Sequence, residues 1–92
     1  MNLREVIFSD GKVISIKSTS NGLVMCLKAY DDSLLEIALV GDVAFEIHDC
    51  FGYSIAASEL SRRDSRYRLE LKNDEGVNVL VIDFSEGDYK SM

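Results

Sequence analysis

The sequence predicts a mainly β domain, an antiparallel meander of about seven strands that forms a small sandwich, a roll or a strongly curved sheet. Two observations predict this class. Turn-forming residues recur at short intervals, and the segments between them alternate apolar and polar side chains. Asp-Gly and Asn-Gly suit tight hairpins because both residues tolerate a positive φ angle. The turn signals are Asp10-Gly11, Asn21-Gly22, Asp31-Asp32-Ser33, Gly41-Asp42 and Asn73-Asp74-Glu75-Gly76.

The first half of the chain is expected to hold four strands, at residues 4–9, 12–18, 22–29 and 35–39. In the second strand, Ile14 and Ile16 share one face because side chains alternate along a strand. The third strand is apolar on both faces, which favours two packed layers over a flat sheet. Its apolar residues are Leu23, Met25 and Leu27 on one side and Val24 and Cys26 on the other.

Three further strands are expected, at residues 42–48, 65–72 and 77–84. The fifth and sixth strands have one apolar and one polar face, whereas the seventh is apolar on both sides and belongs in the interior. The apolar faces are Val43, Phe45 and Ile47 in the fifth strand and Tyr67, Leu69 and Leu71 in the sixth.

Two segments lack the alternation of a strand. Residues 54–62 carry a weak helical stripe, and Ser54 could cap a helix that begins at Ile55, so at most one short helix is expected there. A loop or an irregular strand stays open for the same segment. The polar residues 85–92 are expected to fray. No linker or repeat divides the chain, so residues 1–92 are expected to form one domain.

Composition limits the classes of partner. The 92 residues carry a formal net charge of −6, and an acidic surface repels the phosphates of nucleic acids. The apolar runs are too short to span a bilayer. Charges at Arg4, Glu5 and Asp10 argue against a signal peptide. We therefore expect a cytoplasmic protein with neither a nucleic-acid nor a membrane partner.

One short stretch holds three reactive residue types, His48, Asp49 and Cys50. On a strand Asp49 points away from the other two, so only His48 and Cys50 share a face. With Cys26 they could begin a zinc site, and Cys50 could act as a nucleophile beside His48. The ligand set is incomplete and no nucleophile motif is present, so we predict no catalytic residue, no metal and no cofactor. A small metal-binding or cysteine-dependent enzyme is the alternative.

Recognition by the protein surface is the function that remains, and it predicts a non-catalytic interaction domain. We expect a protein partner of basic charge, and a homodimer as well, because a meander leaves strand edges open. A small-molecule module with an apolar pocket between the layers is a second alternative. The candidate contacts are an acidic set, Asp31, Asp32, Glu36 and Glu46, and a basic set, Arg62, Arg63, Arg66 and Arg68.

The runs "LLEIALVGDVAFEIHDCFGYSI" and "YRLELKNDEGVNVLVIDF" resemble small bacterial proteins of uncharacterised function, which include immunity partners of polymorphic toxins. The shared features are an apolar strand, a Val-x-Phe strand after a turn, a Gly-x-Ser-Ile bend and two closing strands. The resemblance implies an acidic, non-catalytic, partner-binding protein of immunity or regulatory type. It assigns no functional residue.

Overall fold

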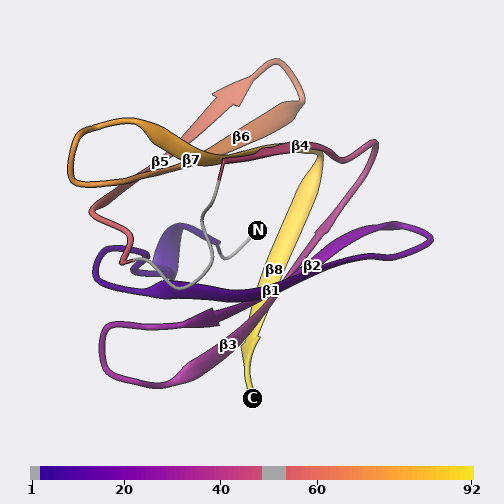
Figure 1. The fold of residues 1–92 in the computed structure, drawn as a ribbon. Coiled ribbons are helices and arrows are strands. Elements are labelled where there is room, and N and C mark those ends of the chain that lie inside the picture. Colours follow the sequence, from indigo (N-terminus) through magenta and orange to yellow (C-terminus); the bar gives the residue numbers. More distant parts are fainter. Residues whose placement is uncertain (1–2, 49–53) are drawn as a thin grey trace.

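A computed structural model describes residues 3–48 and 54–92, and it confirms the antiparallel β prediction. The described residues form two four-stranded antiparallel sheets that pack face to face (Figure 1). The first sheet has the order β1 (Lys12–Ser18), β2 (Gly22–Lys28), β3 (Leu34–Val40) and β8 (Glu86–Ser91). The second has the order β4 (Ala44–Ile47), β7 (Asn78–Phe84), β6 (Arg66–Lys72) and β5 (Ala57–Arg63). A single 3-10 turn, η1 (Leu3–Glu5), lies against β8.

The core lies between the inner faces of the two sheets. Strict alternation along β2, β6 and β7 turns every second side chain inward, as the sequence pattern of these strands predicts. The buried residues on these strands and on β3 are Leu23, Met25, Leu27, Ile37, Leu39, Leu69, Leu71, Leu80, Ile82 and Phe84. Each sheet therefore has one face committed to the core and one outer face.

The strand expected at residues 4–9 is not formed. Local turns occupy its backbone groups instead: the amide of Val6 donates to the carbonyl of Leu3, and that of Gly11 donates to Phe8. Leu3 and Phe8 are buried in the core. The segment therefore acts as a plug at the side of the sandwich through Leu3 and Phe8, whereas Ile7 is 55% exposed.

Residues 54–62 contain no helix. Ser54 makes an isolated bridge with Lys12, and residues 57–63 form β5, which pairs with β6 along its whole length. Leu60 lies opposite Leu69 and packs against the core. The irregular strand left open for this segment is the correct alternative, because the hydrophobic partner across the ladder outweighs a weak helical stripe.

The tail expected to fray is strand β8, paired with β3 from Leu35 to Val40. Its inward position is Gly87, which has no side chain to reveal an apolar alternation. A Cβ at Gly87 would stand 2.6 Å from side-chain carbons of both Leu3 and Leu39. A glycine is thus needed where the N-terminal plug meets the first sheet. Because glycine is not an apolar side chain, the sequence of β8 lacks the alternation that would identify a strand.

Two apolar side chains that alternation groups with other apolar residues are exposed. A bulge between Val13 and Ser15 shifts the register of β1, so Val13 is buried and Ile14 is 51% exposed. Phe45 lies on β4, a four-residue strand at the sheet edge, and is 46% exposed. Edge position and bulge explain why alternation alone misplaces these two residues.

Candidate functional site

Cys26 and His48, two of the three residues proposed for metal binding, belong to different sheets. Cys26 is on the outer face of the first sheet, where its Sγ lies 3.6 Å from Sδ of Met92. His48 follows β4 in the second sheet, and its Nε2 lies 3.0 Å from Oε1 of Glu46. Cys50 lies outside the described residues. Within residues 3–48 and 54–92, no three His, Cys, Asp or Glu side chains form a group that could hold a metal ion.

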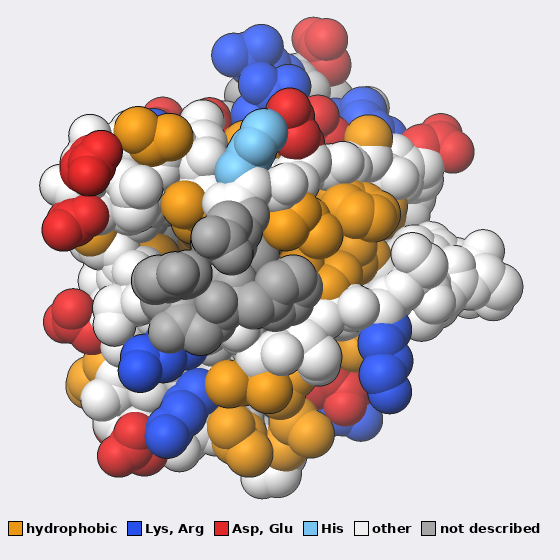
Figure 2. All heavy atoms as spheres, viewed as in Figure 1, with side chains coloured by type: hydrophobic (Ala, Val, Ile, Leu, Met, Phe, Trp, Pro, Cys, Tyr) orange, Lys and Arg blue, Asp and Glu red, His pale blue; other side chains and the backbone are white. Residues whose placement is uncertain are grey.

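Acidic side chains gather at one end of the sandwich. Asp10, which precedes β1, borders one hollow with Asp32 of the β2–β3 turn and another with Asp74 of the β6–β7 turn. These side chains, with their neighbours Asp31 and Glu75, are exposed. In Figure 2 acidic side chains follow the left-hand end of the molecule, where Figure 1 shows the loops between β2 and β3 and between β6 and β7. We call Asp10, Asp31, Asp32, Asp74 and Glu75 the acidic end.

Hydrogen bonds hold the two acidic turns in place. The amide of Ser33 donates to the Asp31 carboxylate at 3.1 Å, and bonds from Ser33 lower the pKa of Asp31. In the other turn, Oδ1 of Asn73 accepts hydrogen bonds from the backbone amides of Glu75 and Val77, at 2.9 and 3.0 Å. Fixed turns lose less conformational entropy on binding, so the acidic end is already organised for contact.

Nearby lysines reduce the negative charge of the acidic end but do not neutralise it. Nζ of Lys28 lies 3.5 Å from the Asp32 carboxylate, and Nζ of Lys72 lies 3.7 Å from Glu70. Lys12 pairs across the ladder with Lys28 and lines the same hollow as Asp10 and Asp32. The lysines are fewer than the carboxylates of the acidic end, so its net charge is negative.

The other two predicted acidic contacts lie elsewhere. Glu36 is on the outer face of the first sheet, with Oε1 3.7 Å from Nζ of Lys90. Glu46 is on β4 of the second sheet and pairs with His48. Glu36 and Glu46, placed together in the predicted acidic set, therefore lie on different sheets, because the chain crosses between the sheets after β3.

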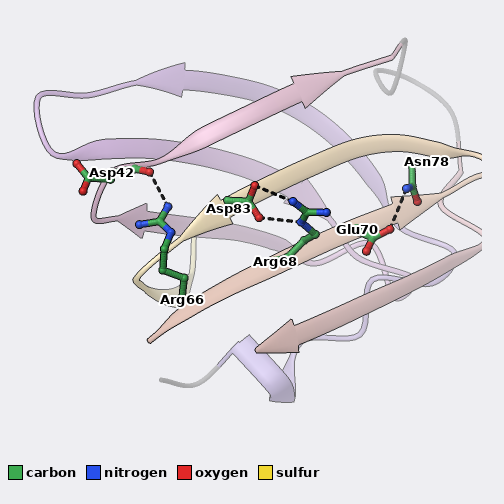
Figure 3. A network of polar contacts seen from close by, with 6 residues as sticks. All are labelled: Asp42, Arg66, Arg68, Glu70, Asn78 and Asp83. Atoms are coloured by element: carbon green, nitrogen blue, oxygen red, sulfur yellow. Dashed lines mark hydrogen bonds and ion pairs between the residues drawn. The ribbon is translucent and has the colours of Figure 1, made fainter. Parts of the chain in front are cut away.

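The basic set divides into engaged and exposed residues. Arg66 donates to the carbonyl oxygens of Gly41 and Asp42 at 3.2 and 2.7 Å, which ties β6 to the β3–β4 connection (Figure 3). Arg68 binds Asp83 of β7 through two hydrogen bonds, at 2.8 and 3.3 Å. These two arginines belong to a structural network on the outer face of the second sheet.

Arg62 and Arg63 are exposed near the β5–β6 turn. Arg62 donates from Nε to the carbonyl of Asp64 at 3.1 Å, and its guanidinium carbon lies 5.8 Å from the ring centroid of Tyr67. Both contacts are local to the hairpin. Of the four arginines, Arg62 and Arg63 are the ones whose exposure suits contact with a partner.

Asp83 has a perturbed ionisation. The hydrogen bond from Arg68 lowers the pKa of Asp83 and outweighs burial, which raises it. A carboxyl whose pKa is lower in the folded state contributes stability above its unfolded pKa, about 3.9. That contribution is lost as the pH falls through the folded-state pKa.

We expect Asp83→Asn to lower the free energy of unfolding by about 1 kcal/mol near neutral pH, because Arg68 loses its carboxylate partner. The difference between wild type and variant should shrink between about pH 5 and about pH 2, where Asp83 of the wild type becomes protonated. Urea unfolding across this range measures the difference. Asp74→Asn, in an exposed turn, controls for net charge. A difference that stays constant down to about pH 2 would contradict this account.

Three members of the acidic end were not predicted as contacts, namely Asp10, Asp74 and Glu75. Their types and turn positions are plain in the sequence, but turn residues are commonly acidic for conformational reasons. The missing information is which turns meet at the same end. Antiparallel strands alternate direction, so the start of β1 and the turn after β2 fall together, and sheet packing brings the β6–β7 turn beside them.

A hollow of 540 Å³ lies at the acidic end, lined by residues that include Asp10, His48, Ile55 and Asp74. Its position at the end of the sandwich differs from the interlayer pocket expected for a small-molecule module. The inner faces of the sheets are filled by buried side chains.

Comparison with family models, curated proteins and solved structures finds no match to this chain. Among residues 3–48 and 54–92, no helix has the length and apolarity needed to cross a membrane.

Proposed function

We propose that this chain is a non-catalytic interaction domain whose acidic end binds a basic protein partner. The observation that carries the proposal is the convergence of exposed carboxylates from the β2–β3 turn, the β6–β7 turn and Asp10 on one end of the sandwich. Such a surface attracts a cationic partner over a distance of about 10 Å at moderate salt and speeds its association.

The form of the acidic end supports a protein surface as its ligand. The carboxylates come from three segments and share one end of the sandwich, but they do not surround a single position. This spread suits several basic side chains better than one small cation. The resemblance to immunity partners of polymorphic toxins is consistent with this reading, and a regulatory partner of basic charge fits equally.

A matched pair of variants tests the proposal. The first carries Asp32→Asn, Asp74→Asn and Glu75→Gln, and the second carries Asp42→Asn, Asp64→Asn and Glu59→Gln. Both remove three negative charges, and Asn tolerates the positive φ of Asp32, Asp42 and Asp64. Proteins captured from cells that encode the chain are identified by mass spectrometry, and their binding is measured against salt.

We expect wild type and the second variant to retain a basic partner that the first variant loses, by about tenfold or more in affinity. The affinity for wild type should fall as salt rises. Equal retention by both variants, or capture of no basic protein, would overturn the proposal.

A further inference from the structure

The outer faces of the two sheets differ in chemistry. That of the second sheet carries the polar network of Arg68, Asp83, Glu70 and Asn78. That of the first sheet has apolar side chains on its two central strands, β2 and β3, where Leu34 is 43% exposed, and Met92, which follows β8, is 68% exposed. Hydrophobic side chains reach the surface at the lower edge of Figure 2, on the side where Figure 1 shows the first sheet. The other central residues, each partly exposed, are Val24, Cys26, Ala38 and Val40.

Charges on this face are separated by strand. The β1 and β2 side carries Lys12, Lys17 and Lys28. On the β3 and β8 side are Glu36, Glu86 and Asp88, and there Lys90 is paired with Glu36. The face is therefore basic along β1, mostly apolar on β2 and β3 apart from Lys28 and Glu36, and acidic along β8, where Glu86 and Asp88 outnumber Lys90.

We propose that this outer face is a homodimer interface, on which a second copy docks face to face about a two-fold axis parallel to the strands. Rotation about that axis brings β1 of one copy over β8 of the other, so Lys17 of each copy meets Asp88 of its partner. A two-fold axis across the strands would instead set β1 on β1, with lysine against lysine. Charge complementarity thus favours a second copy of this chain as the partner, and it favours the two-fold axis parallel to the strands.

The shape of the face fits the same arrangement. Rotation also sets β2 of one copy over β3 of the other. In register, Val24 and Ala38 share a row, as do Lys17 and Asp88. Shallow hollows of 300 and 250 Å³ border Ala38, the smallest side chain in the centre of the face. Val24 of one copy therefore stands opposite a depression in the other.

The size of the face sets the strength of the dimer. Four strands of about seven residues cover roughly 19 by 23 Å, or about 440 Å² for each copy. The total of about 900 Å² is at the small end of specific interfaces, so a weak dimer with a micromolar Kd is expected. Lys12 and Lys28 border both this face and the acidic end. Lys17 and Asp88 belong to this face alone, so neither proposal depends on the other.

Charge reversal provides a sharp test. Lys17→Glu and Asp88→Lys each place like charges at both symmetric contacts of a dimer of identical copies. A mixture of the two variants restores opposite charges at both contacts, and so does the double variant. Sedimentation equilibrium from about 5 to about 500 µM measures the masses, with 10.3 kDa for the monomer. Glu59→Lys, on the outer face of the second sheet, is the matched control.

We expect wild type and Glu59→Lys to dimerise, each single reversal to weaken dimerisation by about tenfold or more, and the mixture and double variant to regain it. Circular dichroism verifies that each variant is folded. A wild type that stays monomeric throughout, or a mixture that associates no better than its components, would overturn the inference. Either result leaves binding at the acidic end unaffected, because partner capture with its own variants measures that separately.

Discussion

Replacing Phe84 with alanine is expected to lower the free energy of unfolding by about 3–5 kcal/mol, the largest effect of any single substitution proposed for this chain. Phe84 is the last residue of β7, is fully buried, and stacks on Tyr67 with ring centroids 5.8 Å apart. Its ring also borders Gly87, near the contact of β8 with the N-terminal plug. Alanine would leave a cavity where three segments meet.

The neighbouring strand offers the same residue type as a control. Phe45 on β4 is exposed at the sheet edge, so Phe45→Ala should cost less than about 1 kcal/mol. In thermal unfolding, Phe84→Ala should lower Tm by at least about 12 °C and Phe45→Ala by only a few degrees. Equal shifts for the two variants would mean that Phe84 does not lie in the core.

Ending the chain after Ser85 is the second change with a large expected effect. It removes β8, which pairs with β3 along six positions and covers the inner side chains Leu3 and Leu39. It also removes Tyr89, whose hydroxyl donates to Glu5 at 2.9 Å. Lost cross-strand pairs and newly exposed core should together cost about 3 kcal/mol or more, a large share of the stability of a small domain.

Urea unfolding of the shortened chain measures this cost, and a chain that lacks only the exposed Met92 is the control. The control should differ from wild type by less than about 0.5 kcal/mol. A frayed tail would make both deletions equally harmless. Hydrogen exchange on the intact protein gives a second measure, since amides of β3 that bond to β8 should be protected.

Much of the fold could be predicted because the inward positions of a strand are apolar, which leaves an apolar residue at every second position of the sequence. β2, β6 and β7 show every second residue apolar, and each of these strands lies where the pattern places it. The strands that were missed lack this signal for physical reasons. β5 carries only Leu60 toward the core, and β8 carries Gly87 where a larger residue would collide with Leu3.

The candidate site was less accessible to prediction. Asp31 and Asp32 could be chosen as exposed turn acids, but their meeting with Asp10 and Asp74 depends on how the two sheets stack. The same holds for Arg66 and Arg68, whose charges suggest a surface for partners. Arg66 binds the carbonyl of Asp42 in the β3–β4 connection, and Arg68 binds Asp83 of β7, which only the register between β6 and β7 brings opposite it.

The pairing of β3 with β8 has a consequence for synthesis. β2 and β3 can join as soon as residues 22–40 have left the ribosome, but the free edge of β3 finds its partner only after residues 86–91 are made. All four strands of the second sheet are translated between β3 and β8. Closing so long a loop is slow, and β domains of this kind fold in milliseconds to seconds. The edge of β3 is therefore open to pairing with other chains until β8 is made.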